Sequence, residues 1–535
     1  MNRKIALTAI LALWFAGCRM PDNSNRQIFR YNESAGIATL DPAYAKDQSL
    51  IWGCTQLYNG LVRLDEQLQP QPCIARSWTL SPDGKTYTFT LRRDVRFHKN
   101  PLFHTPDSTR PVTAADFLYS FNRILDPDIA SPGRWIFNDV DRFEAPDDTT
   151  FVIRLTQPFG PFLSLLGMAY CSVVPREVVE HYGPDFRQHP CGTGPFHLQM
   201  WKENVKLVMR RNPLYFEHDS LGRQLPYLDA VAITFIVDKQ TNFLEFVKGN
   251  LDFMNSLDAS YKDELLTRTG QLKDKYADRI HMATTPFLNT EYLGFRMESP
   301  QHPLGDRRIR QAINYGFDRE KMMRYLRNGI GLPGCGGMVP PGLPGFDTVA
   351  PYGYNYNPAL AARLLAEAGH PNGHGLPAIT LSTTANYLDL CKYIQQQLGL
   401  LGLDIKIDVN PPAALSEQVA QGKSPWFRRS WIADYPDAEN YLSLFYSPNR
   451  CPAGSNYTRF SSPAFDRLYR QAKQATNERD RIALYRKMDR MVMEEAPVVV
   501  LYYDQVLHFT RKNVHGLRSN AMNALDLRYV TITKP

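Results

Sequence analysis

The chain has 535 residues, with 61 Lys and Arg against 54 Asp and Glu, which gives a formal net charge of +7. This length allows two to four ordinary domains, or one large two-lobed body with an ample core. The charges are scattered singly and form no basic block of the kind that follows phosphates, so we expect no nucleic-acid partner.

The N-terminus is typical of an export signal. Two cations precede an apolar run, residues 5–16, that is too short to span a bilayer, since a transmembrane helix needs about 20 apolar residues. Small residues stand directly before Cys18 and resemble the lipobox of bacterial lipoproteins. We therefore expect a signal peptide at 1–17, a lipid on Cys18, and a tether at 18–25 that holds the protein on a membrane outside the cytoplasm. The alternative is a soluble secreted protein with a cysteine near the cleavage site.

Two regular elements are predicted in the first third of the chain. Residues 77–97 alternate polar and apolar side chains on both sides of the sequence SPDG, which predicts a β-hairpin with a four-residue turn. Residues 112–125 predict a helix, with Thr113 as its N-cap and Asp116 at the third position of a capping box. Aromatic and aliphatic residues follow there at steps of four.

Later segments repeat these helix signals. Asn357 before a proline predicts a helix start, and Gly369 predicts its end. Ser462 begins another helix in the same way, and the stretch 481–497 predicts a further one, ended by its proline before a strand at 498–503. Because strands and helices alternate throughout, the fold class is α/β.

Eight cysteines are present, so seven remain if Cys18 is lipidated, and at least one thiol must stay unpaired within the chain. Four lie in apolar or periodic segments, where cysteine serves as a small buried hydrophobe: Cys54, Cys73, Cys171 and Cys391. Three lie in loops and are better disulfide candidates, in a pairing that the sequence leaves open: Cys191, Cys335 and Cys451.

Sites for catalysis or metal binding are not expected. His370 and His374 stand four apart, a spacing that holds a metal only on a helix, which the neighbouring proline and glycines disfavour. Cys191 in CGTGPF lacks an assignable base, and a glycine-rich turn where two segments cross closely is the better interpretation. No phosphate loop, nucleophile elbow or zinc helix motif occurs, so we expect neither an enzyme nor a cofactor.

Several stretches, taken in order, resemble the extracellular solute-binding proteins that feed peptide and nickel ABC transporters. They cover nearly the whole mature chain, and they include QLYNGLVRLD, PVTAADFLYSFNRILDP, CGTGPF, PLGDRRIRQAINYGFDREKMM, WIADYPDAENYL and GSNYTRFSSPAFDRL. The resemblance implies the two-lobed periplasmic-binding-protein fold of the peptide-binding type, with a hinge, a third smaller domain, and a ligand enclosed between the lobes. The implied division is lobe I at 26–55, 189–283 and 503–535, an extra domain at 56–188, and lobe II at 284–502.

Asp434 in WIADYPDAEN has two interpretations. On local grounds it is a turn residue, because an aspartate before Tyr-Pro-Asp can bond its own backbone and start a helix. The resemblance implies instead that it meets the α-ammonium of a bound peptide. It also implies that Trp431 lines a side-chain pocket, with core packing as the alternative, and that Arg428 faces the peptide carboxylate. Arg429 competes with Arg428, since strand alternation lets only one face the cleft.

The expected function is therefore that of a monomeric receptor that captures di- or oligopeptides and delivers them to the permease subunits of an ABC importer. A runner-up of the same fold binds nickel complexes, haem or another small solute, although no histidine or methionine cluster argues for nickel. A peptidase or cell-wall hydrolase, and a sensor or chaperone that uses the same cleft, are the remaining alternatives.

Overall fold

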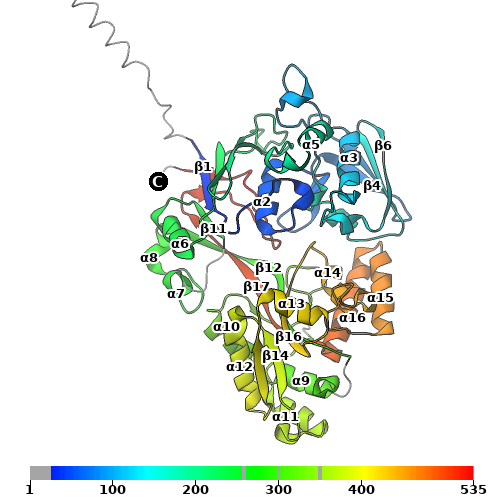
Figure 1. Ribbon diagram of the computed structural model, residues 1–535, viewed down its shortest axis with the longest axis vertical. Helices are drawn as coiled ribbons and strands as arrows, with labels where there is room; N and C mark the ends of the chain where they lie inside the picture. Colours follow the sequence, from blue (N-terminus) through cyan, green and yellow to red (C-terminus); the bar gives the residue numbers. More distant parts are fainter. Residues whose placement is uncertain (1–25, 256–260, 299–301, 348–351, 534–535) are drawn as a thin grey trace, which may run out of the picture.

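The computed structural model describes residues 26–255, 261–298, 302–347 and 352–533, and it contains one large mixed sheet (Figure 1). The sheet order is β15-β14-β16-β12-β17-β11-β1-β10-β9-β8, and β13 pairs with β17. The strands are β1 (Ile28–Asn32), β8 (Phe196–Lys202), β9 (Lys206–Arg211), β10 (Ala230–Thr234), β11 (Phe253–Asn255), β12 (Ile280–Phe295), β13 (Leu332–Pro333), β14 (Ile379–Thr383), β15 (Ile405–Val409), β16 (Trp426–Ile432) and β17 (Val498–Arg511).

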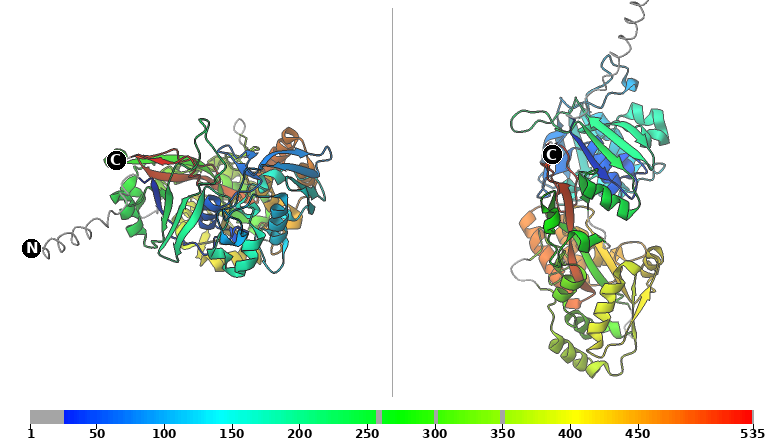
Figure 2. Two further views of the ribbon diagram at one scale, coloured as in Figure 1. Left: turned by 90° about the horizontal axis from the view of Figure 1, so that it is seen from above. Right: turned by 90° about the vertical axis from the view of Figure 1, so that its left-hand side faces the viewer.

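Two long strands, β12 and β17, join the upper and lower parts of the molecule (Figures 1 and 2). They pair antiparallel from Ile280↔Arg511 to Gly294↔Val498. Their register shifts between Pro286 and Thr290, midway along the pairing. Such irregularities bend and twist a strand pair. We therefore expect the direction of the sheet to change here, between the two parts.

A second, four-stranded sheet lies apart from the large one, in the upper right of Figure 1. The predicted hairpin is confirmed, since β4 (Ala75–Leu80) pairs antiparallel with β5 (Thr86–Leu91) across a turn in which Gly84 N donates to Ser81 O at 2.9 Å. The other strands and the helix on this sheet are β6 (Val140–Asp147), β7 (Thr150–Leu155) and α3 (Ala114–Leu125). The capping box of Thr113 and Asp116 is present as predicted.

Helices pack around the two parts. The predicted starts at Asn357 and Ser462 are confirmed, because each side chain accepts a hydrogen bond from a first-turn backbone N–H. The helix predicted at 481–497 begins earlier, at Glu478, where Asn477 caps it. The principal helices are α2 (Gln48–Leu57), α5 (Arg176–Tyr182), α6 (Lys239–Lys248), α9 (Arg307–Tyr315), α10 (Arg319–Leu326), α11 (Pro358–Glu367), α12 (Leu388–Gly399), α13 (Pro412–Ala420), α15 (Pro463–Gln474) and α16 (Glu478–Glu495).

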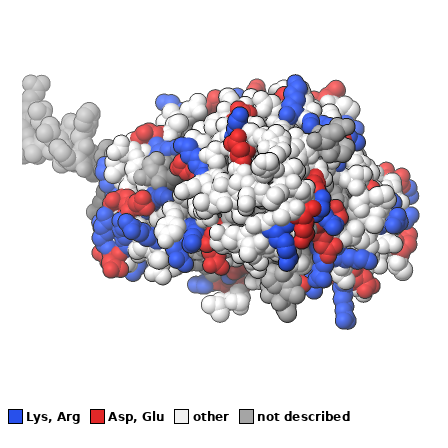
Figure 3. Space-filling view, turned by 90° about the horizontal axis from the view of Figure 1, so that it is seen from below, with Lys and Arg blue, Asp and Glu red and all other residues white. Residues whose placement is uncertain are grey.

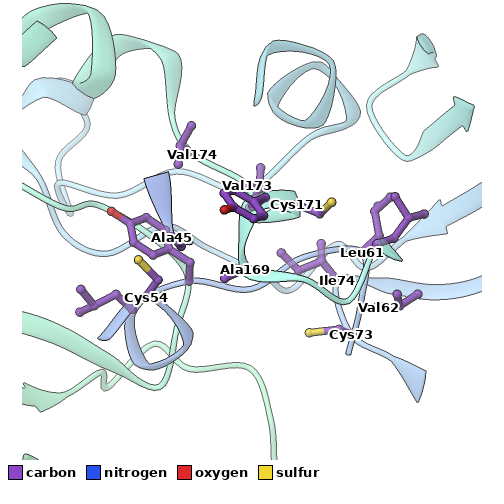
Figure 4. Close-up of a cluster of buried hydrophobic side chains, with 14 of the residues drawn as sticks. Ala45, Cys54, Leu61, Val62, Cys73, Ile74, Ala169, Cys171, Val173 and Val174 are labelled. Atoms are coloured by element: carbon purple, nitrogen blue, oxygen red, sulfur yellow. The ribbon is translucent and has the colours of Figure 1, made fainter. Parts of the chain in front are cut away.

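The cysteines serve mainly as core residues. Cys54, Cys73 and Cys171 lie among buried aliphatic side chains (Figure 4), and Cys391 is buried in a separate cluster, so the prediction of small buried hydrophobes is confirmed. The disulfide prediction is wrong, because all seven cysteines of the described residues carry free thiols. Two of the three disulfide candidates have a backbone acceptor instead: Cys191 Sγ lies 3.6 Å from His98 O, and Cys451 Sγ 2.8 Å from Gly454 O.

Charges of both signs are mixed over the surface, as Figure 3 shows for one face. This agrees with the scattered pattern of the sequence. In the described part of the chain, no helix is long and apolar enough to cross a membrane. Cys18 lies outside the described residues.

Candidate functional site

Strand β16 leads directly into the segment that carries Asp434. It pairs with β12 from Trp426 to Ile432, but with β14 only at Trp426 and Phe427. The last residues of β16 therefore have a partner strand on one side and a free backbone edge on the other. Ala433 N then bonds to Leu288 O at 2.9 Å, which fixes the exit of the strand just before Asp434.

The three carboxylates of WIADYPDAEN have different partners. Asp437 accepts from the backbone N–H of Glu439 at 2.9 Å and lies 3.7 Å from Arg481, and thus performs the local turn and capping role. Glu439 is buried and accepts hydrogen bonds from the hydroxyls of Tyr435 and Tyr469. Asp434 forms no ion pair within the described residues, and its carboxylate accepts only from an asparagine side chain.

That asparagine, Asn440, organises the site and was missed in the sequence. Its side chain is buried; its Oδ1 accepts from Trp431 Nε1 at 2.8 Å and from Asp434 N at 3.2 Å. Its Nδ2 donates to Asp434 Oδ2 at 3.3 Å. One amide thus holds both Trp431 and Asp434, and the only sequence signal for it was its place six residues after the aspartate.

The electrostatic setting of Asp434 disfavours its charge. Water reaches the carboxylate, yet the surrounding protein raises its pKa by burial, an effect that the Asn440 hydrogen bond only partly offsets. Tyr170 lies close enough across the cavity for this charge to act on it: burial first, and the negative charge of Asp434 second, raise the Tyr170 pKa to about 12. The carboxylate is therefore short of positive charge.

Asp434 lines a cavity between the lower and upper parts of the molecule. The cavity has a volume of about 240 Å³ and opens into solvent. Tyr435 and Pro436 continue the wall on the Asp434 side. The opposite walls come from α2, the segments near Met168 and Tyr170, and the 520–528 segment, with a mainly apolar surface and scattered amides: Gln48, Ile51, Trp52, Thr55, Asn59, Met168, Tyr170 and Met522.

The two cations of this cavity, Arg63 and Arg528, already have partners. Arg528 bonds Asp526 at 2.7 Å, and both arginines form ion pairs with Glu217. The negative charge of Asp434 consequently has no counter-charge of its own along the described wall of the cavity.

Trp431 does not line this cavity. Its ring is half-buried, packs against the cluster that contains Tyr292 and Tyr441, and donates its Nε1–H to Asn440. The contacts of Trp431 therefore show that it packs on the core and positions Asn440.

Arg428 lies apart from Asp434 and is also absent from the cavity wall. It forms an ion pair with Glu291 of β12, whose side chain is only 3% exposed, and stacks on Tyr387 with its guanidinium carbon 3.3 Å from the ring centroid. Burial raises the pKa of Glu291, and the charge of Arg428 opposes that rise. Arg428 is therefore paired with a carboxylate of its own chain, Glu291, which the sequence did not predict.

Arg429 points to the other face of the strand. Its Nη1 donates to Ser416 Oγ at 3.0 Å, and its guanidinium lies 3.9 Å from the centre of the Tyr457 ring. The alternation argued from the sequence is therefore present, and it separates Arg428 from Arg429.

No group of three or more His, Cys, Asp or Glu suited to a metal occurs among the described residues, and His370 Nδ1 lies 3.0 Å from His374 O.

A model of the family "Bacterial extracellular solute-binding proteins, family 5 Middle" matches residues 69–451. This chain belongs to that family. Its members are non-catalytic binding proteins of ABC transporters that act outside the cytoplasm, and the mixed α/β periplasmic-binding-protein fold agrees with this assignment.

Individual relatives differ in ligand. A glutathione-binding protein, GsiB of Salmonella choleraesuis strain SC-B67, is 26% identical over 488 residues, which are 90% of each chain. A periplasmic binding protein, DppA from Helicobacter pylori in complex with the peptide STSA, is 25% identical with a TM-score of 0.74, over 96% of this chain and 99% of that one. The murein tripeptide-binding protein MppA in its open form is 24% identical with a TM-score of 0.78, over 96% and 98%.

Proposed function

We propose that this protein captures di- or oligopeptides with a free α-amine and delivers them to the permease subunits of an ABC importer. The observation that carries the proposal is Asp434, a carboxylate at a cavity wall that its surroundings partly desolvate and that no cation of the described chain neutralises. A ligand ammonium would complete a charge-assisted pair there, and such pairs are roughly twice as strong as neutral hydrogen bonds.

The free edge of β16 supports a peptide rather than a compact solute. Residues 428–432 pair with β12 alone, so their other edge offers backbone donors and acceptors to an extended ligand. Ile432, at the end of this edge, is 52% exposed. An added strand gives affinity through main-chain hydrogen bonds, and polar contacts bridged by water would tolerate varied side chains.

The Glu291–Arg428 pair refines which ligand charge matters. Because Arg428 is already neutralised, a peptide carboxylate would have to displace Glu291 or share its cation. We therefore assign the main charge recognition to the amine at Asp434, and to Arg428 at most a secondary role for peptides of one length.

Closure around the ligand is the second part of the proposal. We propose lobe I at 26–55, 189–283 and 503–535, the extra domain at 56–188, and lobe II at 284–502. The register shift near Pro286 supports a hinge there. The extra domain and lobe II already touch, through Lys473 with Asp139 at 2.8 Å and the Trp135 and Tyr435 rings at 5.8 Å, and these contacts would break on opening. Small-angle scattering should show a smaller radius of gyration with bound peptide, and an unchanged radius at saturation contradicts the hinge.

A lipid on Cys18 is the third part. The supporting observation is the short apolar run with small residues before the cysteine. Cys18→Ser should move the protein from the membrane fraction to the soluble fraction, and unchanged retention of this variant would overturn the anchor.

Native mass spectrometry of the purified protein tests the ligand class directly. We expect added masses that correspond to peptides of two to several residues and that tandem fragmentation reads as sequences. Asp434→Asn protein, purified in parallel, should carry less of them. Co-purified nickel or haem, or a single non-peptide solute, would contradict the proposal and favour the runner-up of the same fold.

A further inference from the structure

In the described part of the chain, one face of the upper part of the large sheet opens into a hollow that α6 borders only through Glu245. The strands β1, β10 and β9 turn Phe29, Val231 and Leu207 into the core, where each is fully buried. The alternate side chains point outward, and they surround a hollow of about 880 Å³ that is open to solvent. Four apolar residues of the strands line it: Ile28, Val208, Ala230 and Ala232.

The rim of this hollow is strongly basic. Five cations line it, and we call them the cationic face: Arg26, Arg30, Lys206, Arg210 and Arg211. Among the described residues, two acidic ones line the same hollow, Asp229 and Glu245.

Most of this positive charge has no acidic partner. Arg30 pairs with Asp252 at 3.3 Å and Arg211 with Asp229 at 3.0 Å. Arg26, Lys206 and Arg210 are exposed and form no ion pair with any described residue. Three cations without an acidic partner therefore lie around one hollow.

Exposed apolar side chains lie at one end of the cationic face. The register Lys206↔Thr234 places the loop before β9 beside the loop after β10. Val205 and Val237 stand in these two loops and are 52% and 76% exposed. The two exposed valines and the cationic face together form an amphipathic surface, with the charged side chains over the strands and the valines in the loops at the strand ends.

The chain enters the sheet at the opposite end of the same face. Arg26 precedes β1, and Cys18 stands eight residues before it in the sequence. A fully extended segment of that length reaches about 28 Å. The proposed lipid on Cys18 would thus keep the cationic face within reach of the bilayer surface.

We propose that the cationic face, with Val205 and Val237, is a docking surface for an anionic lipid bilayer. The lipid phosphates would neutralise Arg26, Lys206 and Arg210, and the valines would enter the headgroup boundary. Charge attraction at a bilayer acts within a Debye length, about 8–10 Å, so a nearby tether strengthens it by holding the cationic face close to the membrane. A lipid chain and a basic patch together give stable attachment where one signal alone is marginal.

This inference rests in part on the proposed lipid at Cys18, but it is independent of the peptide proposal, since none of its residues lines the Asp434 cavity. An acidic protein segment is the competing occupant. The bilayer is favoured because the exposed valines have no role in binding an acidic chain, whereas they match the apolar boundary under a layer of phosphates.

Vesicle sedimentation tests the proposal, using the full chain with Cys18→Ser so that only the surface contributes. The protein should bind vesicles that contain phosphatidylglycerol, not pure phosphatidylcholine, and high salt should weaken the binding. Lys206→Glu with Arg210→Glu should reduce it roughly 30-fold, and Val237→Ser should reduce it less.

The matched control reverses two exposed cations that lie far away in the lower part, Lys392→Glu with Lys406→Glu, and it should bind within about twofold of the parent. Thermal melting checks that all variants fold. Three results would overturn the proposal. The first is no binding to anionic vesicles, and the second is an equal loss in the control pair. The third is displacement of the protein from vesicles by polyglutamate as effectively as by free anionic vesicles, which would assign the face to an acidic protein.

Discussion

Two charged regions of the lower part, around Asp434 and around Arg428, differ in whether the chain itself supplies a counter-charge. Asp434 lies at a cavity wall with a single amide as its partner, whereas Arg428 is enclosed with Glu291 and Tyr387. Both were candidate ligand contacts by resemblance, and both are partly desolvated. The difference teaches that a charge satisfied by its own chain contributes to stability, while a charge left without a partner is available to a ligand.

Removal of Glu291 should produce the largest effect and fall on stability. Glu291→Ala leaves Arg428 partly buried without its counter-charge, and we expect the free energy of unfolding to drop by about 3–5 kcal/mol. Urea denaturation measures this. The double variant Glu291→Ala, Arg428→Ala should recover much of the loss, since no lone charge remains. A drop below about 1 kcal/mol would place the pair with ordinary surface ion pairs.

Asp434 should show the opposite pattern. Asp434→Asn keeps the shape and the Asn440 contact but removes the charge, so peptide affinity should fall by about 2–4 kcal/mol, roughly 30- to 1000-fold. Stability should rise slightly or stay constant, because burial of this carboxylate is unfavourable. Calorimetry and thermal melting on the same samples give both values. A large stability loss with unchanged affinity would reverse the roles of the two regions.

Asn440→Ala should have an intermediate effect on affinity. The change frees Trp431 Nε1 and removes the donor to Asp434, so both groups lose their fixed positions. We expect a loss of about 1–2 kcal/mol in peptide affinity. Asn410→Ala, at a half-buried asparagine after β15 that does not line the cavity, is the matched control. Equal affinities of the two variants would show that Asn440 has no positioning role.

The pH should alter stability by the smallest amount. Buried Asp489 accepts from Met338 N, Val339 N and the Tyr352 hydroxyl, yet burial raises its pKa to about 6. A carboxyl whose folded-state pKa exceeds its unfolded value of 3.8 binds protons more readily when folded, so stability falls as the pH rises from 3.8 to about 6. From Asp489 we expect about 1 kcal/mol more stability at pH 5 than at pH 7.5. Unfolding curves at both pH values check this, and the difference should shrink in Asp489→Asn.

Local signals in the sequence predicted the local structure. The hairpin at 77–97 and the helix starts at Thr113, Asn357 and Ser462 were correct because turn and capping residues act on neighbours a few positions away. The disulfide candidates were wrong because a loop position does not reveal burial, and Cys191 is buried.

The site was only partly accessible from the sequence. Asp434 could be named by resemblance, but its lack of a cation depends on which segments surround the cavity. Glu291 could not be named, because it meets Arg428 across 137 positions through the β12–β16 register. Asn440 is close in sequence to Asp434, yet only the folded turn between them shows that its side-chain amide points back to the Asp434 carboxylate.

The central claim, that Asp434 is the partner of a peptide amine, is tested most directly by calorimetry on one peptide in free and N-acetylated forms, with wild type and Asp434→Asn. Acetylation removes the ammonium, so it should weaken binding strongly in the wild type and little in Asp434→Asn, where the charge is already gone. If acetylation weakens binding equally in both proteins, Asp434 does not meet the amine and the account is contradicted.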